Sequence, residues 1–121
     1  MSAGRMRRVD EAVRAVLSDA IASDLKDPRI GFVTVTAVKT SPDLRHARVY
    51  VSVLGDDQAR VASLEGLRSA HGFLQRRVAA ELTLKHTPAL TFEYDASVER
   101  GMRISQLLDD QARADDAGDD A

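Results

Sequence analysis

The chain has no cysteine and no apolar run long enough to cross a membrane. Without cysteine there is neither a disulfide scaffold nor a thiolate metal site, and this composition suits a reducing compartment, so we expect a cytoplasmic protein. A membrane-spanning helix needs ~20 predominantly apolar residues, so no membrane association is expected. Asp10, Glu11 and Arg14 interrupt the N-terminal region, which excludes a secretory signal there.

The sequence also lacks the motifs and spacings by which catalytic and metal-binding residues are recognised. No glycine-rich phosphate-binding loop is present. His46, His71 and His86 are too far apart in sequence to show metal-ligand spacing. Glu93 and Asp95 alternate along one expected strand and could mimic a catalytic carboxylate pair, but such a pattern is more typical of a solvated sheet edge. We therefore expect no enzyme activity, no metal or other cofactor, and no small-molecule substrate.

The net charge of −2 hides an uneven charge distribution. Residues 109–121 contain six acidic residues and one basic residue, whereas residues 1–108 contain 16 basic and 13 acidic residues. Arginine supplies 14 of the 17 basic side chains, and its planar guanidinium suits bidentate phosphate contact. These features predict a single folded domain over residues 1–108 and a disordered acidic tail over residues 109–121. Clustering of the arginines would indicate a nucleic-acid partner.

Hydrophobic periodicity predicts the element order α-β-β-α-α-β-α. Apolar residues recur at three- and four-residue spacing in the expected helices and alternate in the expected strands. A strand with one apolar face needs helices packed on that face. We therefore predict a two-layer α+β domain, a three-stranded sheet with helices packed on one face. The expected elements cover residues 5–25, 32–41, 45–54, 58–85 (interrupted), 90–94 and 98–108.

Two details of this pattern can be checked against a structure. In the first strand, strict alternation places Val33, Val35 and Ala37 on the core face. In the last helix, the apolar anchors are expected to be Ile104, Leu107 and Leu108.

The long helical segment is interrupted at Ser69 and Gly72. A glycine inside a helix costs about 0.5–1 kcal/mol relative to alanine, so the break predicts a kink between two helices. The corner could face RNA, or the helix could simply bend around its own core. Four arginines surround the break: Arg60, Arg68, Arg76 and Arg77.

A second arginine group, Arg5, Arg7 and Arg8, begins the first helix. Cations at a helix N-terminus oppose the helix macrodipole, so helix stability does not explain them. A phosphate contact explains them better, although a frayed basic start is the alternative. Lys39, Arg45, His46 and Arg48 lie near the tip of the expected hairpin.

Three stretches, together with the element order, resemble the bacterial ribosome-binding factor A family, which has a type II KH fold. They are DPRIGFVTVT (27–36), SPDLRHARVYVSVLG (41–55) and TPALTFEYDASVERGMRISQLL (87–108). A usual KH domain clamps nucleotides with a GxxG loop between its paired helices. This chain has Ser69-Ala70-His71-Gly72 there, which is similar to the Ala-x-Gly corner of the family. The acidic tail lies outside the resemblance, and Ala89 stands where the family has an acidic residue.

The resemblance implies a non-catalytic assembly factor that binds free or immature 30S subunits and 16S rRNA. It would assist late maturation and 5′ end processing of 16S rRNA, especially in the cold, and we expect it to act as a monomer. The candidate RNA-binding residues, chosen by charge and by motif match, are Arg5, Arg7, Arg8, Arg45, Arg68, Ser69, Ala70, Gly72, Arg76, Arg77 and Lys85.

A protein–protein adaptor is the alternative that the sequence leaves open. The sheet and the acidic tail would then dock a ribosomal protein or another partner, because an acidic tail repels RNA and attracts a basic protein.

Overall fold

The computed structural model describes residues 3–97 and 107–112. Its elements follow the predicted order through the third strand. The predicted terminal helix over residues 98–108 lies largely outside the described residues, and residues 107–112 are helical. Leu107 and Leu108 are 67% and 65% exposed, so their expected role as apolar anchors is wrong. The elements are α1 (Ala3–Ser23), β1 (Val33–Thr40), β2 (His46–Val53), α2 (Asp57–Ser69), α3 (His71–Glu81) and β3 (Ala89–Tyr94).

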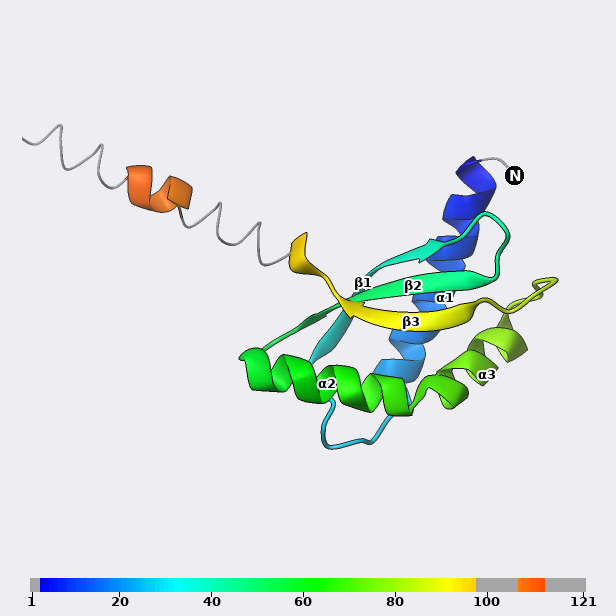
Figure 1. The fold of residues 1–121 in the computed structure, drawn as a ribbon, viewed down its shortest axis with the longest axis horizontal. Coiled ribbons are helices and arrows are strands. Elements are labelled where there is room, and N and C mark those ends of the chain that lie inside the picture. Colours follow the sequence, from blue (N-terminus) through cyan, green and yellow to red (C-terminus); the bar gives the residue numbers. More distant parts are fainter. Residues whose placement is uncertain (1–2, 98–106, 113–121) are drawn as a thin grey trace, which may run out of the picture.

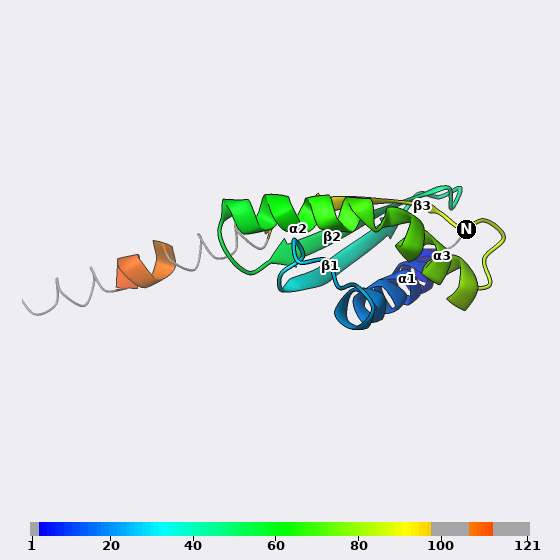
Figure 2. The same ribbon diagram turned by 90° about the horizontal axis from the view of Figure 1, so that it is seen from below.

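The three strands form one mixed sheet in the order β1-β2-β3. The β1–β2 hairpin is antiparallel, and β3 joins β2 in parallel after the helical crossover. Helices α1 and α3 lie under one face of the sheet, and α2 runs alongside β3 (Figures 1 and 2). No helix or strand among residues 3–97 and 107–112 packs on the opposite face of the sheet.

A single core fills the space between the sheet and the helices. Val13 and Leu17 of α1 are completely buried against the hairpin and α3. Leu67 at the end of α2 and Leu74 near the start of α3 are also completely buried, so the helix corner is anchored in the core. None of the described helices is long and apolar enough to span a membrane.

Strand β1 departs from strict alternation. The pairing register with β2 shifts between Val35 and Ala37, which is a β-bulge. Val35 and Val38 are buried at 4% and 6% exposure, whereas Ala37 is not buried. The prediction that Ala37 faces the core is therefore wrong, because the extra residue of the bulge reverses the phase of every later side chain.

The predicted kink between two helices is confirmed. Helix α2 ends at Ser69 and α3 begins at His71, with Ala70 between them at φ −86° and ψ 7°. Gly72 lies inside the first turn of α3, so no left-handed glycine makes this turn. At the other end of α2, the Asp56 carboxylate caps the helix by accepting a hydrogen bond from the Ala59 N–H.

Candidate nucleic-acid interface

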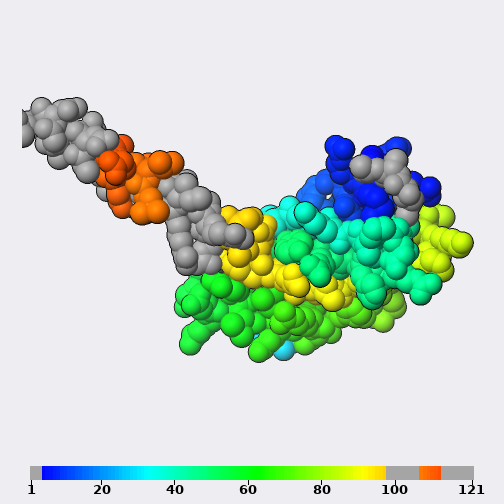
Figure 3. Space-filling view, turned by 45° about the horizontal axis from the view of Figure 1, so that its top comes forward, coloured from blue at the N-terminus to red at the C-terminus, as the bar shows by residue number. Residues whose placement is uncertain are grey.

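The structure places ten of the eleven candidate residues in two groups, and Arg77 belongs to neither. The first, which we call the basic end surface, lies at the N-terminal end of α1 and contains Arg5, Arg7, Arg8, Arg45 and Lys85. The second, the helix corner, joins α2 to α3 and contains Arg68, Ser69, Ala70, Gly72 and Arg76. Figure 3 shows the start of α1, the β1–β2 turn and the loop before β3 next to one another at one end of the molecule.

Three separate segments build the basic end surface. Arg5 and Arg8 line a shallow hollow together with Leu84, the neighbour of Lys85 in the chain. The β1–β2 turn reaches the same loop, because the Ala89 N–H donates a 2.8 Å hydrogen bond to the carbonyl of Arg45. All five basic side chains of this surface belong to exposed residues.

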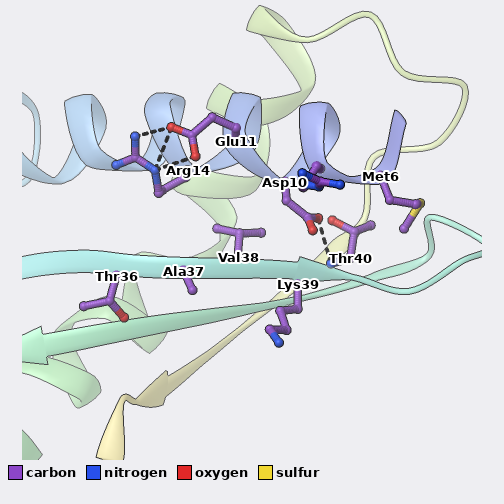
Figure 4. Close-up of a pocket in the computed structure, with 10 residues that line it drawn as sticks. Met6, Asp10, Glu11, Arg14, Thr36, Ala37, Val38, Lys39 and Thr40 are labelled. Carbon is purple, nitrogen blue, oxygen red and sulfur yellow. Dashed lines mark hydrogen bonds and ion pairs between the residues drawn. The ribbon is translucent and has the colours of Figure 1, made fainter. Parts of the chain in front are cut away.

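The hollow between α1 and β1 has mixed charge and marks the border of this surface (Figure 4). Asp10 accepts a 2.9 Å hydrogen bond from the Thr40 N–H. One turn further along α1, Arg14 pairs with Glu11, and their hydrogen bond raises the pKa of Arg14 and lowers that of Glu11. After its first two turns, this side of α1 therefore carries carboxylates as well as cations.

The helix corner presents a small, open backbone with arginines on either side. The Arg68 guanidinium donates a 3.1 Å hydrogen bond to the carbonyl of Phe92 in β3, which fixes the end of α2 to the sheet. Arg76 is exposed, and its guanidinium folds back toward Gly72, where an added Cβ would lie 3.4 Å from Nη1. An alanine at position 72 would therefore be in van der Waals contact with this guanidinium.

Arg77 has a structural role that its charge alone did not indicate. It forms ion pairs with Asp24, with Asp19 at 3.3 Å, and with Glu81 at 2.9 Å. Two of these carboxylates belong to the end of α1 and the residue just after it, so Arg77 ties α3 to α1. The expectation that Arg77 neutralises phosphate does not fit this arrangement, because three protein carboxylates already surround its guanidinium.

Arg60 does not take part in the corner either. Its guanidinium lies 4.0 Å from the centre of the Tyr94 ring at the end of β3. It also donates a 2.8 Å hydrogen bond to Asp57, one turn earlier in α2. Cation–π stacking on Tyr94 links α2 to the end of β3, whereas the ion pair with Asp57 lies within α2.

Sequence reasoning missed two polar side chains that position the site. The Gln75 amide donates to the Pro88 carbonyl at 2.5 Å and accepts from the Leu90 N–H at 3.1 Å, which fixes the start of β3 to α3. Asp95 accepts a 2.6 Å hydrogen bond from Thr36 and caps Ser97, so its carboxylate is an anchor for the end of β3. Among residues 3–97 and 107–112, no three potential metal ligands lie together.

Residues 5–108 match the model of the ribosome-binding factor A family. The chain belongs to this family. It is 50% identical over 104 residues to the ribosome-binding factor A of Geobacter sulfurreducens, covering 86% of this chain and 88% of the relative. The type II KH-like α+β fold predicted from the sequence is thereby confirmed.

Solved structures of the family share the fold. The crystal structure of ribosome-binding factor A from Thermus thermophilus superimposes with a TM-score of 0.66 at 26% identity, covering 74% of this chain and 93% of that one. A Thermus thermophilus ribosome-binding factor A model fitted into a cryo-EM map of its complex with the 30S subunit gives a TM-score of 0.60, also at 26% identity. That comparison covers 72% of this chain and 91% of the fitted model.

Proposed function

We propose that this protein is a ribosome assembly factor that binds free or immature 30S subunits through 16S rRNA. It assists late maturation and 5′ end processing of that rRNA, especially in the cold. It acts in the cytoplasm as a monomer, without catalysis and without a cofactor. Residues 1–108 form the binding domain, and residues 109–121 form an acidic tail.

The observation that carries this proposal is the convergence of three separate segments on the basic end surface. Arg5 and Arg8 share a hollow with the loop that holds Lys85, and Arg45 is hydrogen-bonded to the end of that loop. The arginines at the start of α1 oppose the helix macrodipole, so they do not serve the stability of the helix. Their charge suits contact with RNA phosphates, and the family relationship, together with the 30S complex of the Thermus relative, supports a ribosomal RNA as the source.

No bond chemistry is needed for this function. A protein that binds one RNA conformer better than its competitors shifts the population toward that conformer by its difference in affinity. Misfolded RNA helices persist longer at low temperature, so the benefit of such a shift is greatest in the cold. The helix corner lacks a GxxG clamp, which favours recognition of RNA backbone and shape there over the reading of single bases.

The first experiment measures binding to purified 30S subunits by co-sedimentation at several salt concentrations. The variant R5Q/R8Q/K85Q removes three charges from the basic end surface, and R14Q/K26Q/R29Q removes three charges elsewhere. If the three side chains contact phosphates, the slope of log K against log salt becomes shallower by about 2–3 in the first variant only. Equal slopes for the two variants would show that this surface is not the contact.

A second experiment tests the role in maturation. A strain without the gene should accumulate unprocessed 16S rRNA and free 30S subunits at low temperature. The wild-type gene should reduce both to normal levels, and the R5Q/R8Q/K85Q gene should not. Incubating the purified protein with precursor 16S rRNA should leave the RNA uncut, because the proposed role is binding without catalysis. A chain lacking residues 109–121 that binds naked rRNA but no longer binds whole subunits would favour the protein–protein adaptor.

A further inference from the structure

The open face of the sheet carries a group of side chains that the proposed function does not use. Lys39, His46, Arg48 and Tyr50, here called the sheet-face cluster, line one hollow of about 540 Å³ together with Thr91. The three basic residues are exposed and Tyr50 is half-buried. Figure 4 shows Lys39 pointing away from α1 while Val38 points toward it, so this hollow lies on the face opposite the core.

The two strongest cations of the cluster face each other. Lys39 lies directly opposite Arg48 in the antiparallel β1–β2 ladder. Like charges at directly opposed positions destabilise a sheet, so the pairing does not serve stability. The β-bulge creates this pair, since continued alternation from Val35 would turn Lys39 toward the core. Within the described part of the chain, Lys39 makes no ion pair.

An aromatic ring completes the surface. Tyr50 follows Arg48 on the same face of β2, roughly 7 Å further along the strand. Hydrogen bonding to the Tyr50 side chain, and after it the nearby Glu93 carboxylate, raise the pKa of Arg48, so Arg48 and Tyr50 are close neighbours on this face. Glu93 lies opposite Tyr50 on β3 and forms the acidic limit of the cluster.

We propose that the open sheet face is a second RNA site, at which a single-stranded segment stacks a base on Tyr50 and places its phosphates against Lys39 and Arg48. A flat ring beside cations on a pleated surface is the combination that single-stranded nucleic acids recognise. An acidic peptide would use the cations but leave the ring without a role. The inference rests on the proposed function for the choice of RNA, and it adds a contact on the face opposite α1.

The test measures the binding of the full chain to fluorescein-labelled octauridylate by fluorescence anisotropy. K39Q/R48Q should weaken binding at least tenfold and make the salt slope shallower by about 1.4, because two phosphate contacts are lost from a single strand. K26Q/R29Q, which removes two charges from the loop before β1, should bind as the wild type does. Equal affinities for these two double variants would overturn the proposal.

Tyr50 separates base stacking from simple charge attraction. Y50L should weaken octauridylate binding several-fold, and Y50F should not, because phenylalanine keeps the ring. Unchanged binding by Y50L, together with displacement of the RNA by poly-glutamate, would assign the surface to an acidic protein segment instead. A test on the wild type needs no variant. Octauridylate should shift the amide NMR signals of Lys39, Arg48 and Thr91. Shifts confined to the helix corner would contradict the proposal.

Co-sedimentation of the wild type with 30S subunits distinguishes the two proposals. If the protein binds subunits but not octauridylate, the sheet-face site is wrong and the assembly role stands. If it binds octauridylate through Lys39 and Arg48 but does not bind subunits, the sheet-face site stands and the assembly role is wrong.

Discussion

The helix corner and the open sheet face both carry cations, but the fold holds them in opposite ways. Arg68 of the corner donates to a backbone carbonyl, and Arg77, next to the corner in α3, is surrounded by three carboxylates. On the sheet face, Lys39 and Arg48 stand directly opposite each other, with Tyr50 beside them. Charges that the fold itself neutralises stabilise it, whereas like charges that the fold brings together need an anionic partner.

The partners of each arginine within the fold separate structural cations from candidate RNA contacts, which charge alone does not do. Near the corner, the exposed Arg76 remains a candidate for phosphate contact, and Arg77 does not. At the other end, the basic end surface and the sheet-face cluster meet at the β1–β2 turn, where Arg45 and His46 are neighbours in the chain. The cations that we propose as ligand contacts are therefore concentrated around the hairpin more than around the helix corner.

Replacing Arg77 should have the largest effect on stability. R77L removes three ion pairs and leaves Asp19, Asp24 and Glu81 close together, so we expect the free energy of unfolding to fall by about 1–2 kcal/mol. Urea denaturation measures this. R76L, one position earlier and exposed, should change it by less than about 0.5 kcal/mol. Equal losses in the two variants would mean that the two arginines are not distinguished as the structure indicates.

The sequence predicted the fold because its local signals agreed with one another. Alternating strands and a glycine-interrupted helical segment favoured the same α-β-β-α-α-β order, and the buried residues Val49, Leu67 and Leu74 all lie within the predicted elements. The bulge in β1 could not be read in advance, because Thr36 and Ala37 carry no signal that distinguishes a bulge from continued alternation.

The candidate site was only partly predictable, since charge does not reveal partners that are distant in sequence. Arg77 and Asp19 are 58 positions apart, so their contact depends on how α3 packs on α1. Gly66 likewise packs closely on the loop before β1, where an added Cβ would lie 2.5 Å from Ile30 Cγ1. This contact, too, depends on tertiary packing. The hairpin cations were visible in the sequence, but their pairing across the ladder required the register.

Gly72 offers an intermediate effect that tests the corner itself. The residue lies within α3 at an ordinary backbone conformation, so G72A should raise the free energy of unfolding by up to about 0.5–1 kcal/mol. If RNA backbone approaches the bare Cα, the same variant should bind 30S subunits more weakly although it is more stable. G31A, in the loop before β1, where an added Cβ comes no closer than 3.9 Å to its nearest neighbour Ser63, is the control. Unchanged subunit binding by G72A would leave the corner as a purely structural hinge.

The smallest effect concerns the β1–β2 turn that links the two ligand-facing surfaces. The Asp43 carboxylate accepts hydrogen bonds from the Ser41 hydroxyl at 2.6 Å and from the Arg45 N–H at 3.0 Å. These bonds, in that order, lower the pKa of Asp43 below its ordinary value of 3.8. A carboxyl whose pKa is lower in the folded state stabilises the protein above its unfolded pKa, and this contribution is lost as the pH falls through the folded value.

D43N should therefore lower the urea midpoint slightly near neutral pH, and the difference from the wild type should shrink as the pH approaches about 3. D109N, on the exposed helical segment 107–112, is the control and should have the same urea midpoint as the wild type near neutral pH. A difference for D43N that persists unchanged to low pH would mean that the turn depends on the shape of the side chain and not on its charge. In that case the conformation of the turn that carries Arg45 would not depend on the protonation of Asp43.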